Sequence, residues 1–345
     1  MIKFRISAIM IFTMLLVFSF YVSIAKSDDS KNMDLNEVLT YTLPNGILFK
    51  MIATPDIPIN NTFPTGTNDS DSSNVPARFI MGETEVTYEL WYKVYKWATT
   101  NVGGGKREDG GGLYKFANAG IEGSNGKVGA KPTSAKREPV TKVNWRDSIV
   151  WCNALTEYYN ANNGTKAVLI CVYTYNGSII RDSTNSNALA CDNTIQNLTA
   201  KGFRLPTSNE WEFVARYRGT DTTNAVAGSD GTYYTKGNSA SGDTQACNAS
   251  TPTLGDYSVY RLNSDKTSIV KTKKPNALGV YDMSGNVWEW CFDWHPDFVG
   301  KYRVIRGGTY FYAENIIQLG EVSCGDQFSE GEEMDDYGFR FCRTR

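Results

Sequence analysis

Long turn-rich stretches separate the few segments of this chain that show regular hydrophobic periodicity. Glycine accounts for 31 of the 345 residues, and the irregular stretches 101–138 and 219–276 are dominated by turn-forming residues. Helical periodicity is limited to two segments. Within 78–100, an apolar start is followed by the N-cap candidate Thr87 and a helical pattern through Leu90, Val94 and Trp97, and a second helix is expected to begin after Asn144. A length of 345 residues allows one large domain or two ordinary ones. Long loops on so little regular structure usually carry function.

Three shorter signals complete the organisation of the chain. Alternating apolar residues over 39–52, centred on Pro44, Asn45 and Gly46, predict a β-hairpin. Thr207 is expected to cap a short helix. The glycine triplets of 101–138 lack the lysine and hydroxyl residue that end a phosphate-binding loop, so a surface loop is the better interpretation.

Charge and histidine content exclude several classes of function. The formal net charge is −2, which gives no broad basic face for a nucleic-acid backbone. The chain has one histidine, His295, whereas zinc or non-haem iron sites built on imidazoles need two or three. A lone histidine beside a proline is not expected to act as a ligand or a base.

The first 25 residues have the layout of a secretory signal peptide. Lys3 and Arg5 precede an apolar run, and Ser23-Ile24-Ala25 places small residues where signal peptidase reads the chain. The alternative is an uncleaved membrane anchor. We expect residues 1–25 to be a signal peptide, 26–38 a polar linker and 39–345 an exported domain in the cell envelope, on the surface or outside the cell.

The cysteines do not form a redox or zinc motif. None of the seven stands in a CxxC pair, and an odd number leaves at least one thiol unpaired within the chain. Cys171 and Cys191 flank one irregular insertion, which suggests a disulfide that would staple it.

Seven groups of residues occur in an order that resembles one known family. They are 81–87 (MGETEVT), 139–145 (PVTKVNW), 151–155 (WCNAL), 202–206 with 210–212 (GFRLP, EWE), 279–290 (GVYDMSGNVWEW), 306–308 (RGG) and 338–340 (GFR). The ordered set resembles the formylglycine-generating-enzyme, or sulfatase-modifying-factor, family over about residues 40–345. The resemblance implies an α+β fold of the elaborated C-type-lectin-like type with little regular secondary structure.

Most residues of these motifs are expected to stabilise the fold. Trp145, Trp211, Trp288 and Trp290 would supply large buried areas. Arginines 204 and 340 would hold loops through forked hydrogen bonds.

The catalytic cysteines of the family are missing. Its enzymes oxidise a sulfatase cysteine with two closely spaced, copper-binding cysteines, and Tyr312 and Ile317 stand at the matching positions. Neither side chain can be a thiolate ligand. Cys324 and Cys342 have the wrong spacing to replace the pair. We therefore expect no catalytic residues and no copper.

The resemblance also implies a structural calcium site. In relatives, the matching segment binds calcium through its first and last side chains and through carbonyl groups between them. The corresponding residues are Asp282 and Glu289, with the carbonyls of Gly285 and Val287; oxygen ligands suit this cation. The alternative is that both carboxylates only accept hydrogen bonds from neighbouring amides.

The segment 310–337 has the most unusual composition of the chain. It contains eight acidic residues, no lysine or arginine, and three aromatic residues at its start. Some family members are variable proteins of diversity-generating retroelements, in which the segment between the RGG and GFR motifs varies. By that resemblance the candidate ligand contacts are Tyr310, Phe311, Tyr312, Glu314, Asn315, Ile317, Glu321 and Ser323.

Three hypotheses follow. The first is a secreted or surface-displayed, non-catalytic binding protein that recognises a protein or other macromolecule, and not a nucleic acid, through 310–337. The second is an oxidase that generates formylglycine in sulfatases. The third is a structural envelope protein whose fold only packs against partners.

Overall fold

The computed structural model describes residues 37–43, 46–55, 60–75, 77–100, 113–133, 137–161, 168–248, 250–326 and 335–345. The predicted signal peptide, nearly all of the predicted linker, the glycine triplets and part of the acidic segment lie outside these ranges. Within them, no helix is both long and apolar enough to span a membrane.

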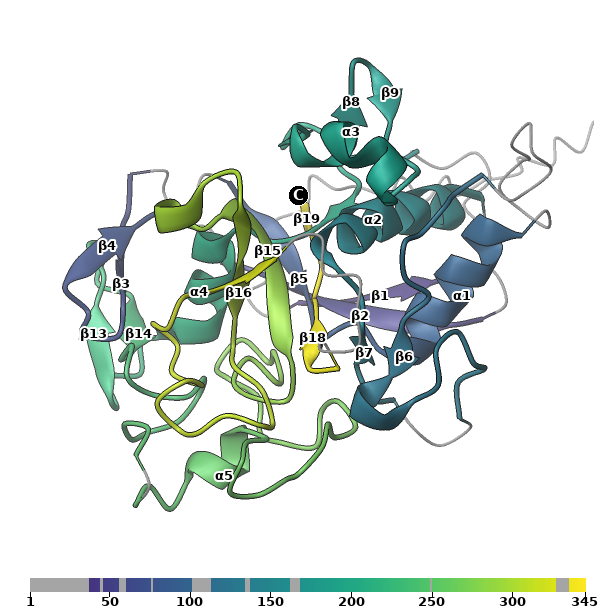
Figure 1. Cartoon of the computed structure of the whole chain (residues 1–345). Helices are drawn as coiled ribbons and strands as arrows, with labels where there is room; N and C mark the ends of the chain where they lie inside the picture. The colour runs from purple at the N-terminus through teal and green to yellow at the C-terminus, as the bar shows by residue number, and fades with distance from the viewer. Residues whose placement is uncertain are drawn as a thin grey trace, which may run out of the picture. The chain divides into compact units, whose positions relative to one another are not determined.

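The largest sheet joins strands from both ends of the sequence. Its order is β1 (Val38–Thr42), β2 (Leu48–Ala53), β5 (Phe79–Gly82), β19 (Cys342–Thr344) and β11 (Phe203–Arg204), and all neighbours are antiparallel. The pairing of β1 with β2 confirms the predicted hairpin. The last strand of the chain thus lies between two strands formed much earlier in the sequence (Figure 1).

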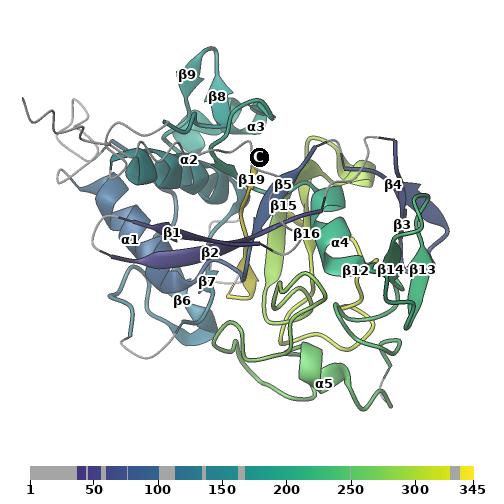
Figure 2. The ribbon, with the colours of Figure 1, turned by 180° about the vertical axis from the view of Figure 1, so that it is seen from behind.

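Two helices cover part of this sheet. In α1 (Tyr88–Thr99), the Thr87 hydroxyl accepts a hydrogen bond from Leu90 N, which confirms the predicted cap. In α2 (Trp145–Ala161), Asp147 lies in the first turn and exchanges hydrogen bonds with Asn144. Trp91 of α1 stacks on Trp151 of α2 with ring centroids 5.9 Å apart. From behind, β1 and β2 cross in front of α1 (Figure 2).

A second sheet carries the C-terminal motifs. Its order is β17 (Ser323–Asp326), β16 (Tyr302–Arg306), β15 (Trp288–Trp294) and β18 (Tyr337–Gly338), with β18 parallel to β15. Helix α4 (Ser208–Arg216) packs against β15 and β16. Thr207 and Glu210 form a capping box at the start of α4, which confirms the N-cap predicted at Thr207.

The remaining elements are short and decorate these two sheets. Two-stranded pairs are β3 (Phe63–Thr65) with β4 (Asp71–Ser73) and β6 (Ile121–Glu122) with β7 (Val140–Thr141). Three-stranded sheets are β8 (Tyr173–Tyr175), β9 (Ser178–Ile179) and β10 (Ile195–Gln196), and β12 (Tyr217–Gly219), β13 (Ala225–Ala227) and β14 (Tyr233–Thr235). Short helical turns are α3 (Ala188–Asp192), α5 (Leu254–Tyr257), η1 (Gly123–Asn125), η2 (Asn185–Asn187) and η3 (Pro296–Phe298).

The expected α+β fold with few regular elements is therefore confirmed, and so is the burial of the motif tryptophans. Trp145, Trp211, Trp288 and Trp290 are all buried. The indole N–H groups of Trp145, Trp211 and Trp290 donate hydrogen bonds to buried acceptors. Trp290 Nε1, for example, donates to Val143 O at 3.0 Å.

The suggested disulfide between Cys171 and Cys191 is wrong, because all seven cysteines are free. Cys171 Sγ donates to Asn153 O, and Cys191 Sγ donates to Asp182 O. Burial raises the pKa of each of these two thiols to about 12. They act as small buried residues, and the insertion is held by other contacts.

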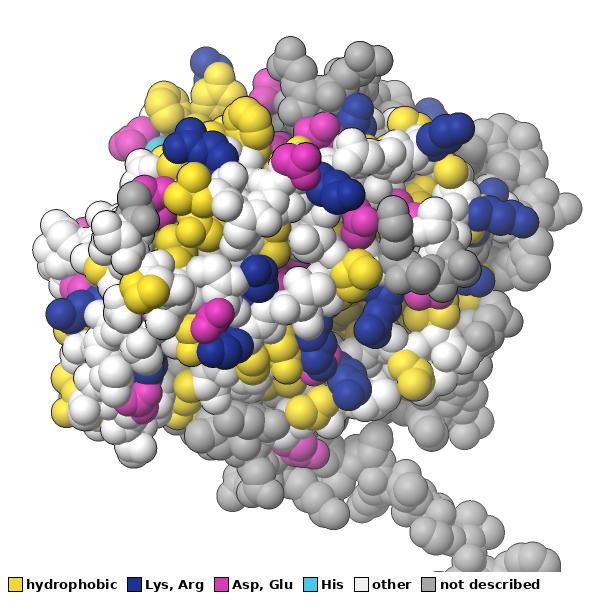
Figure 3. All heavy atoms as spheres, turned by 90° about the horizontal axis from the view of Figure 1, so that it is seen from below, with side chains coloured by type: hydrophobic (Ala, Val, Ile, Leu, Met, Phe, Trp, Pro, Cys, Tyr) yellow, Lys and Arg dark blue, Asp and Glu magenta, His cyan; other side chains and the backbone are white. Residues whose placement is uncertain are grey.

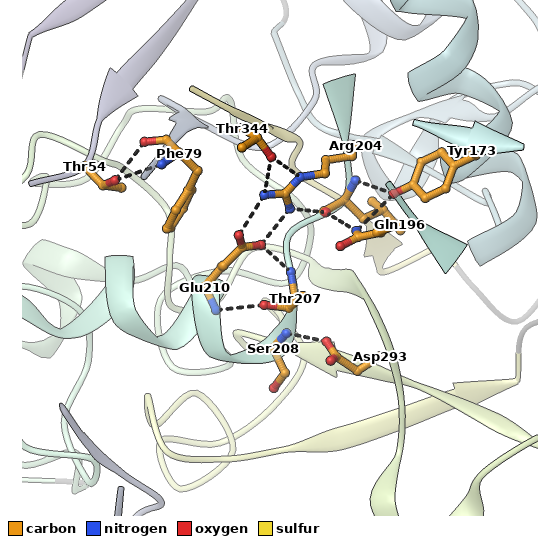
Figure 4. A network of polar contacts seen from close by, with 11 residues as sticks. Thr54, Phe79, Tyr173, Gln196, Arg204, Thr207, Ser208, Glu210, Asp293 and Thr344 are labelled. Atoms are coloured by element: carbon orange, nitrogen blue, oxygen red, sulfur yellow. Dashed lines mark hydrogen bonds and ion pairs between the residues drawn. The ribbon is translucent and has the colours of Figure 1, made fainter. Parts of the chain in front are cut away.

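Arg204 confirms the role expected of the motif arginines. Its guanidinium donates to both oxygens of Glu210 at 2.7 Å, and also to Thr344 Oγ1 on β19 (Figure 4). Both charged side chains are almost fully buried. One forked contact thus ties β11, the start of α4 and β19 together.

We predict that Arg204→Met lowers the free energy of unfolding by about 3–5 kcal/mol, because it leaves the Glu210 carboxylate buried and unpaired. Chemical denaturation followed by tryptophan fluorescence measures the change. Lys274→Met is the matched control, because its pair with Asp256 lies on the surface and should contribute little to stability. Equal losses in the two variants would contradict the prediction.

Candidate ligand-binding face

A tight turn before β15 sets the geometry of the candidate site. Gly285 has φ +80°, and an added Cβ would lie 2.0 Å from Val259 O. Its N–H donates to Gly307 O at 2.8 Å, which joins the turn to the RGG motif. Asp282 and Asn286 also have positive φ, at 57° and 64°. Glycine is required at 285 by both backbone conformation and close approach.

The end of this turn is fixed by a buried ion pair. Arg340 of the GFR motif donates from Nε and Nη2 to the two oxygens of Glu289, each at 2.6 Å. Trp211 Nε1 adds a bond of 2.7 Å to the same carboxylate. Arg340 also donates to Gly82 O, so the pair connects β15 to the first sheet. The forked bonding predicted for Arg340 is thereby confirmed.

These contacts do not fit the implied calcium site. Both oxygens of Glu289 accept hydrogen bonds from nitrogen donors, one of them a guanidinium. A calcium ion would need these oxygens free as ligands. Asp282 Oδ2 accepts a hydrogen bond from Lys271 N at 2.6 Å. Among the described residues, no three metal-ligating side chains come together. Calcium bound by Asp282, Glu289 and the carbonyls of Gly285 and Val287 stays a prediction.

Two exposed aromatic side chains follow the RGG motif. Phe311 is 65% exposed and Tyr312 is 37% exposed. Their ring centroids lie 5.9 Å apart, and Tyr312 packs edge-on against the buried Trp288 at 5.8 Å. Tyr312 N donates to Thr309 O, which shapes the backbone into a turn. The two rings therefore stand on a rigid base and offer apolar surface to solvent.

Two of the predicted contact residues are packing residues instead. Ile317 is 0% exposed and belongs to a buried cluster with Leu254 and Tyr260. It also lies close beneath Gly308, where an added Cβ would come within 2.7 Å of it. Tyr310 is buried as well. Sequence cannot reveal this, because a loop has no periodicity that separates inward from outward positions.

The other predicted contacts lie nearer to the surface. Asn315 is exposed, and Glu314, Glu321 and Ser323 are half-buried. Arg306 Nη1 donates to the backbone carbonyl of Glu321, which fixes that part of the segment. We define the candidate face as the predicted contacts that are not buried: Phe311, Tyr312, Glu314, Asn315, Glu321 and Ser323.

A loop that sequence reasoning missed borders this face. Arg261 N donates to Tyr312 O at 3.1 Å, and the next residue, Leu262, is 59% exposed. Nothing in the sequence of 258–266 signals this proximity. In Figure 3, the underside of the molecule shows hydrophobic side chains interspersed with acidic and basic ones.

The cysteines near this region do not form a replacement pair. Cys324 lies on β17 and is half-buried, whereas Cys342 lies on β19 in the other sheet and is fully buried. Burial raises the pKa of both thiols. His295 accepts a hydrogen bond from Asp297 N and caps η3, which is a local structural role.

Fold and motifs together define a C-type-lectin-like domain of the kind found in formylglycine-generating enzymes. The family described as "Sulfatase-modifying factor enzyme 1-like domain" matches residues 51–345, and the chain belongs to it.

Relatives with different names share this domain. The "Chaperone protein LppX" of Paenibacillus barcinonensis is 30% identical over 242 residues, which cover 63% of this chain and 75% of that protein. The formylglycine-generating enzyme of Streptomyces coelicolor is 29% identical over 154 residues, 40% of this chain and 46% of the enzyme. The chain thus spans less than half of that enzyme.

A solved variable protein has a similar structure. "Treponema denticola variable protein 1" superposes with a TM-score of 0.60 at 28% identity, and covers 89% of this chain and 99% of its own. The structure titled "Crystal Structure of CarF" has the same TM-score of 0.60 at 24% identity, which shows the shared fold. These likenesses confirm the suspected family and its link to a variable protein.

We predict that Asp336→Asn changes the pH dependence of stability. Burial and Asp335 raise the pKa of Asp336 to about 6. The folded state therefore holds a proton that the unfolded state releases, so this group's stabilisation is present below about pH 4 and is lost as the pH rises to about 6. At pH 7.5 the variant should be more stable than the wild type by roughly 1–3 kcal/mol.

At pH 4 the two proteins should have nearly equal free energies of unfolding, since Asp336 is then protonated. Urea denaturation at both pH values measures the difference. A constant difference at the two pH values would contradict the assignment.

Proposed function

We propose that this protein is a non-catalytic binding protein that recognises a protein or other macromolecule through the candidate face. The observation that carries the proposal is the pair Phe311 and Tyr312, whose exposed rings stand on a turn packed against the buried Trp288. Aromatic side chains have few rotatable bonds and bury large areas, so they bind at a low entropic cost.

The surroundings of the pair support this use. Arg306, Gly308 and the buried Ile317 hold the segment from beneath, and the side chains above them can change without altering the core. The similarity to a variable protein agrees with a display role. The expected export of the chain would place such a face where it meets external partners.

The proposal predicts that Phe311→Ala combined with Tyr312→Ala weakens binding at least 30-fold, the scale of losing a central aromatic anchor. Peptides selected from a random library on the immobilised wild-type domain serve as ligands, and calorimetry gives their Kd. Phe298→Ala is the matched control, because Phe298 is also exposed but lies at the end of the β15–β16 hairpin. If the double variant keeps full affinity for every selected peptide, the proposal is wrong.

The rival activity has its own test. The purified domain, supplied with copper, is incubated with a sulfatase-type cysteine peptide, and mass spectrometry follows conversion to formylglycine. We expect no conversion, because Tyr312 and Ile317 occupy the positions of the cysteine pair. Turnover would overturn the non-catalytic proposal.

If the face is diversified, variation should follow exposure. Sequencing of codons 308–337 in many sister cells should show changes at Phe311, Tyr312 and Asn315, which are exposed. Gly308 and Ile317 should stay constant, because each packs against the other. Variation spread equally over exposed and buried positions would contradict this form of display, and a uniform segment would remove the retroelement link.

A further inference from the structure

A cavity separate from the candidate face lies between β2 and the turn that connects β5 to α1. Its volume is about 380 Å³, and its apolar wall includes Leu48, Leu90 and Phe341. No residue of the candidate face lines it. The volume lies within the range of small-molecule sites, which combine apolar walls with a few polar groups.

One wall of the cavity contains a buried acid that lacks a donor. Glu85 is only 2% exposed, and its Oε2 accepts one hydrogen bond from Asn286 Nδ2 at 3.2 Å. Among the described residues, Oε1 has no hydrogen-bond partner. A buried polar atom left in this state costs about 1–3 kcal/mol, so a ligand that donates to it gains affinity.

The cavity is lined by acidic and basic side chains, and burial, together with the nearby Asp282 and Glu289, raises the pKa of the Glu85 carboxyl well above its usual range. Lys271 forms an ion pair with Glu83 at 2.7 Å. No ion pair within the described part of the chain engages Lys50 or Arg137, both of which are exposed. The lining contains three acids and three bases: Glu83, Glu85, Glu89, Lys50, Arg137 and Lys271.

The lining groups select among ligand classes. A simple anion would leave Glu85 Oε1 without a donor, and a simple cation would face Lys50 and Arg137. A ligand that carries one charge of each sign can satisfy both groups at once. The apolar wall adds a place for a hydrocarbon side chain.

We infer that this cavity binds a zwitterion of amino-acid size, with its ammonium group at Glu85 and its carboxylate toward Lys50 and Arg137. An aliphatic side chain would lie against Leu48 and Leu90. The inference does not rest on the function proposed for the candidate face.

Isothermal titration calorimetry of the full domain with L-leucine tests the charge requirement. Two derivatives remove one charge each: L-leucinamide keeps only the ammonium group, and N-acetyl-L-leucine keeps only the carboxylate. We expect saturable binding of leucine and at least tenfold weaker binding of either derivative. The absence of saturable leucine binding up to about 10 mM, or equal binding of a derivative, would overturn the inference.

Variants test the residues. Glu85→Gln and, separately, Lys50→Gln with Arg137→Gln should each weaken leucine binding at least tenfold, whereas Asp326→Asn on β17 should not change it. Circular dichroism checks folding; because Lys50 and Arg137 are exposed, their variant keeps the test valid if Glu85→Gln does not fold. Unchanged affinity in the folded variants would overturn the inference.

Discussion

The buried pair between Arg340 and Glu289 is the contact on which both sheets depend. It joins the GFR motif to β15, and through Gly82 O it reaches the first sheet. A guanidinium and a carboxylate in a buried site must satisfy nearly all of their hydrogen bonds, or their desolvation would cost several kcal/mol. Trp211 and the backbone carbonyls of residues 281 and 282 complete that requirement. Motifs that are far apart in sequence thus each supply a partner to the same buried network.

The contacts that hold the fold together are distinct from the side chains that the fold exposes after the RGG motif. Arg306 adds bonds to the carbonyls of Leu319 and Glu321, so much of the segment after the RGG motif is held through its backbone. Contacts to backbone groups do not depend on side-chain identity. The aromatic residues above this support are consequently free to differ without loss of the scaffold, whichever ligand they bind.

Sequence reasoning succeeded where a local physical rule applies. Helix periodicity and the caps at Thr87 and Thr207 located the helices, and paired strands confirmed the hairpin at 39–52. The ordered motifs led to the family and the fold. Sequence failed where a residue's role depends on distant partners: Ile317 is buried by a loop from another part of the chain, and Glu289 meets Arg340. The spacing of residues along the chain does not show which of them come into contact in the fold.

The place of β19 has a consequence for how a variable segment could be tolerated. Residues 342–344 form the strand between β5 and β11, and they follow the candidate segment in the sequence. The first sheet cannot close until the ribosome has released them. A shift of reading frame or a premature stop within 310–337 would remove β18 and β19 together, and no folded domain would form. Folding would therefore select among genes with an altered segment, because only a gene with an intact reading frame would yield a folded domain that presents the new side chains.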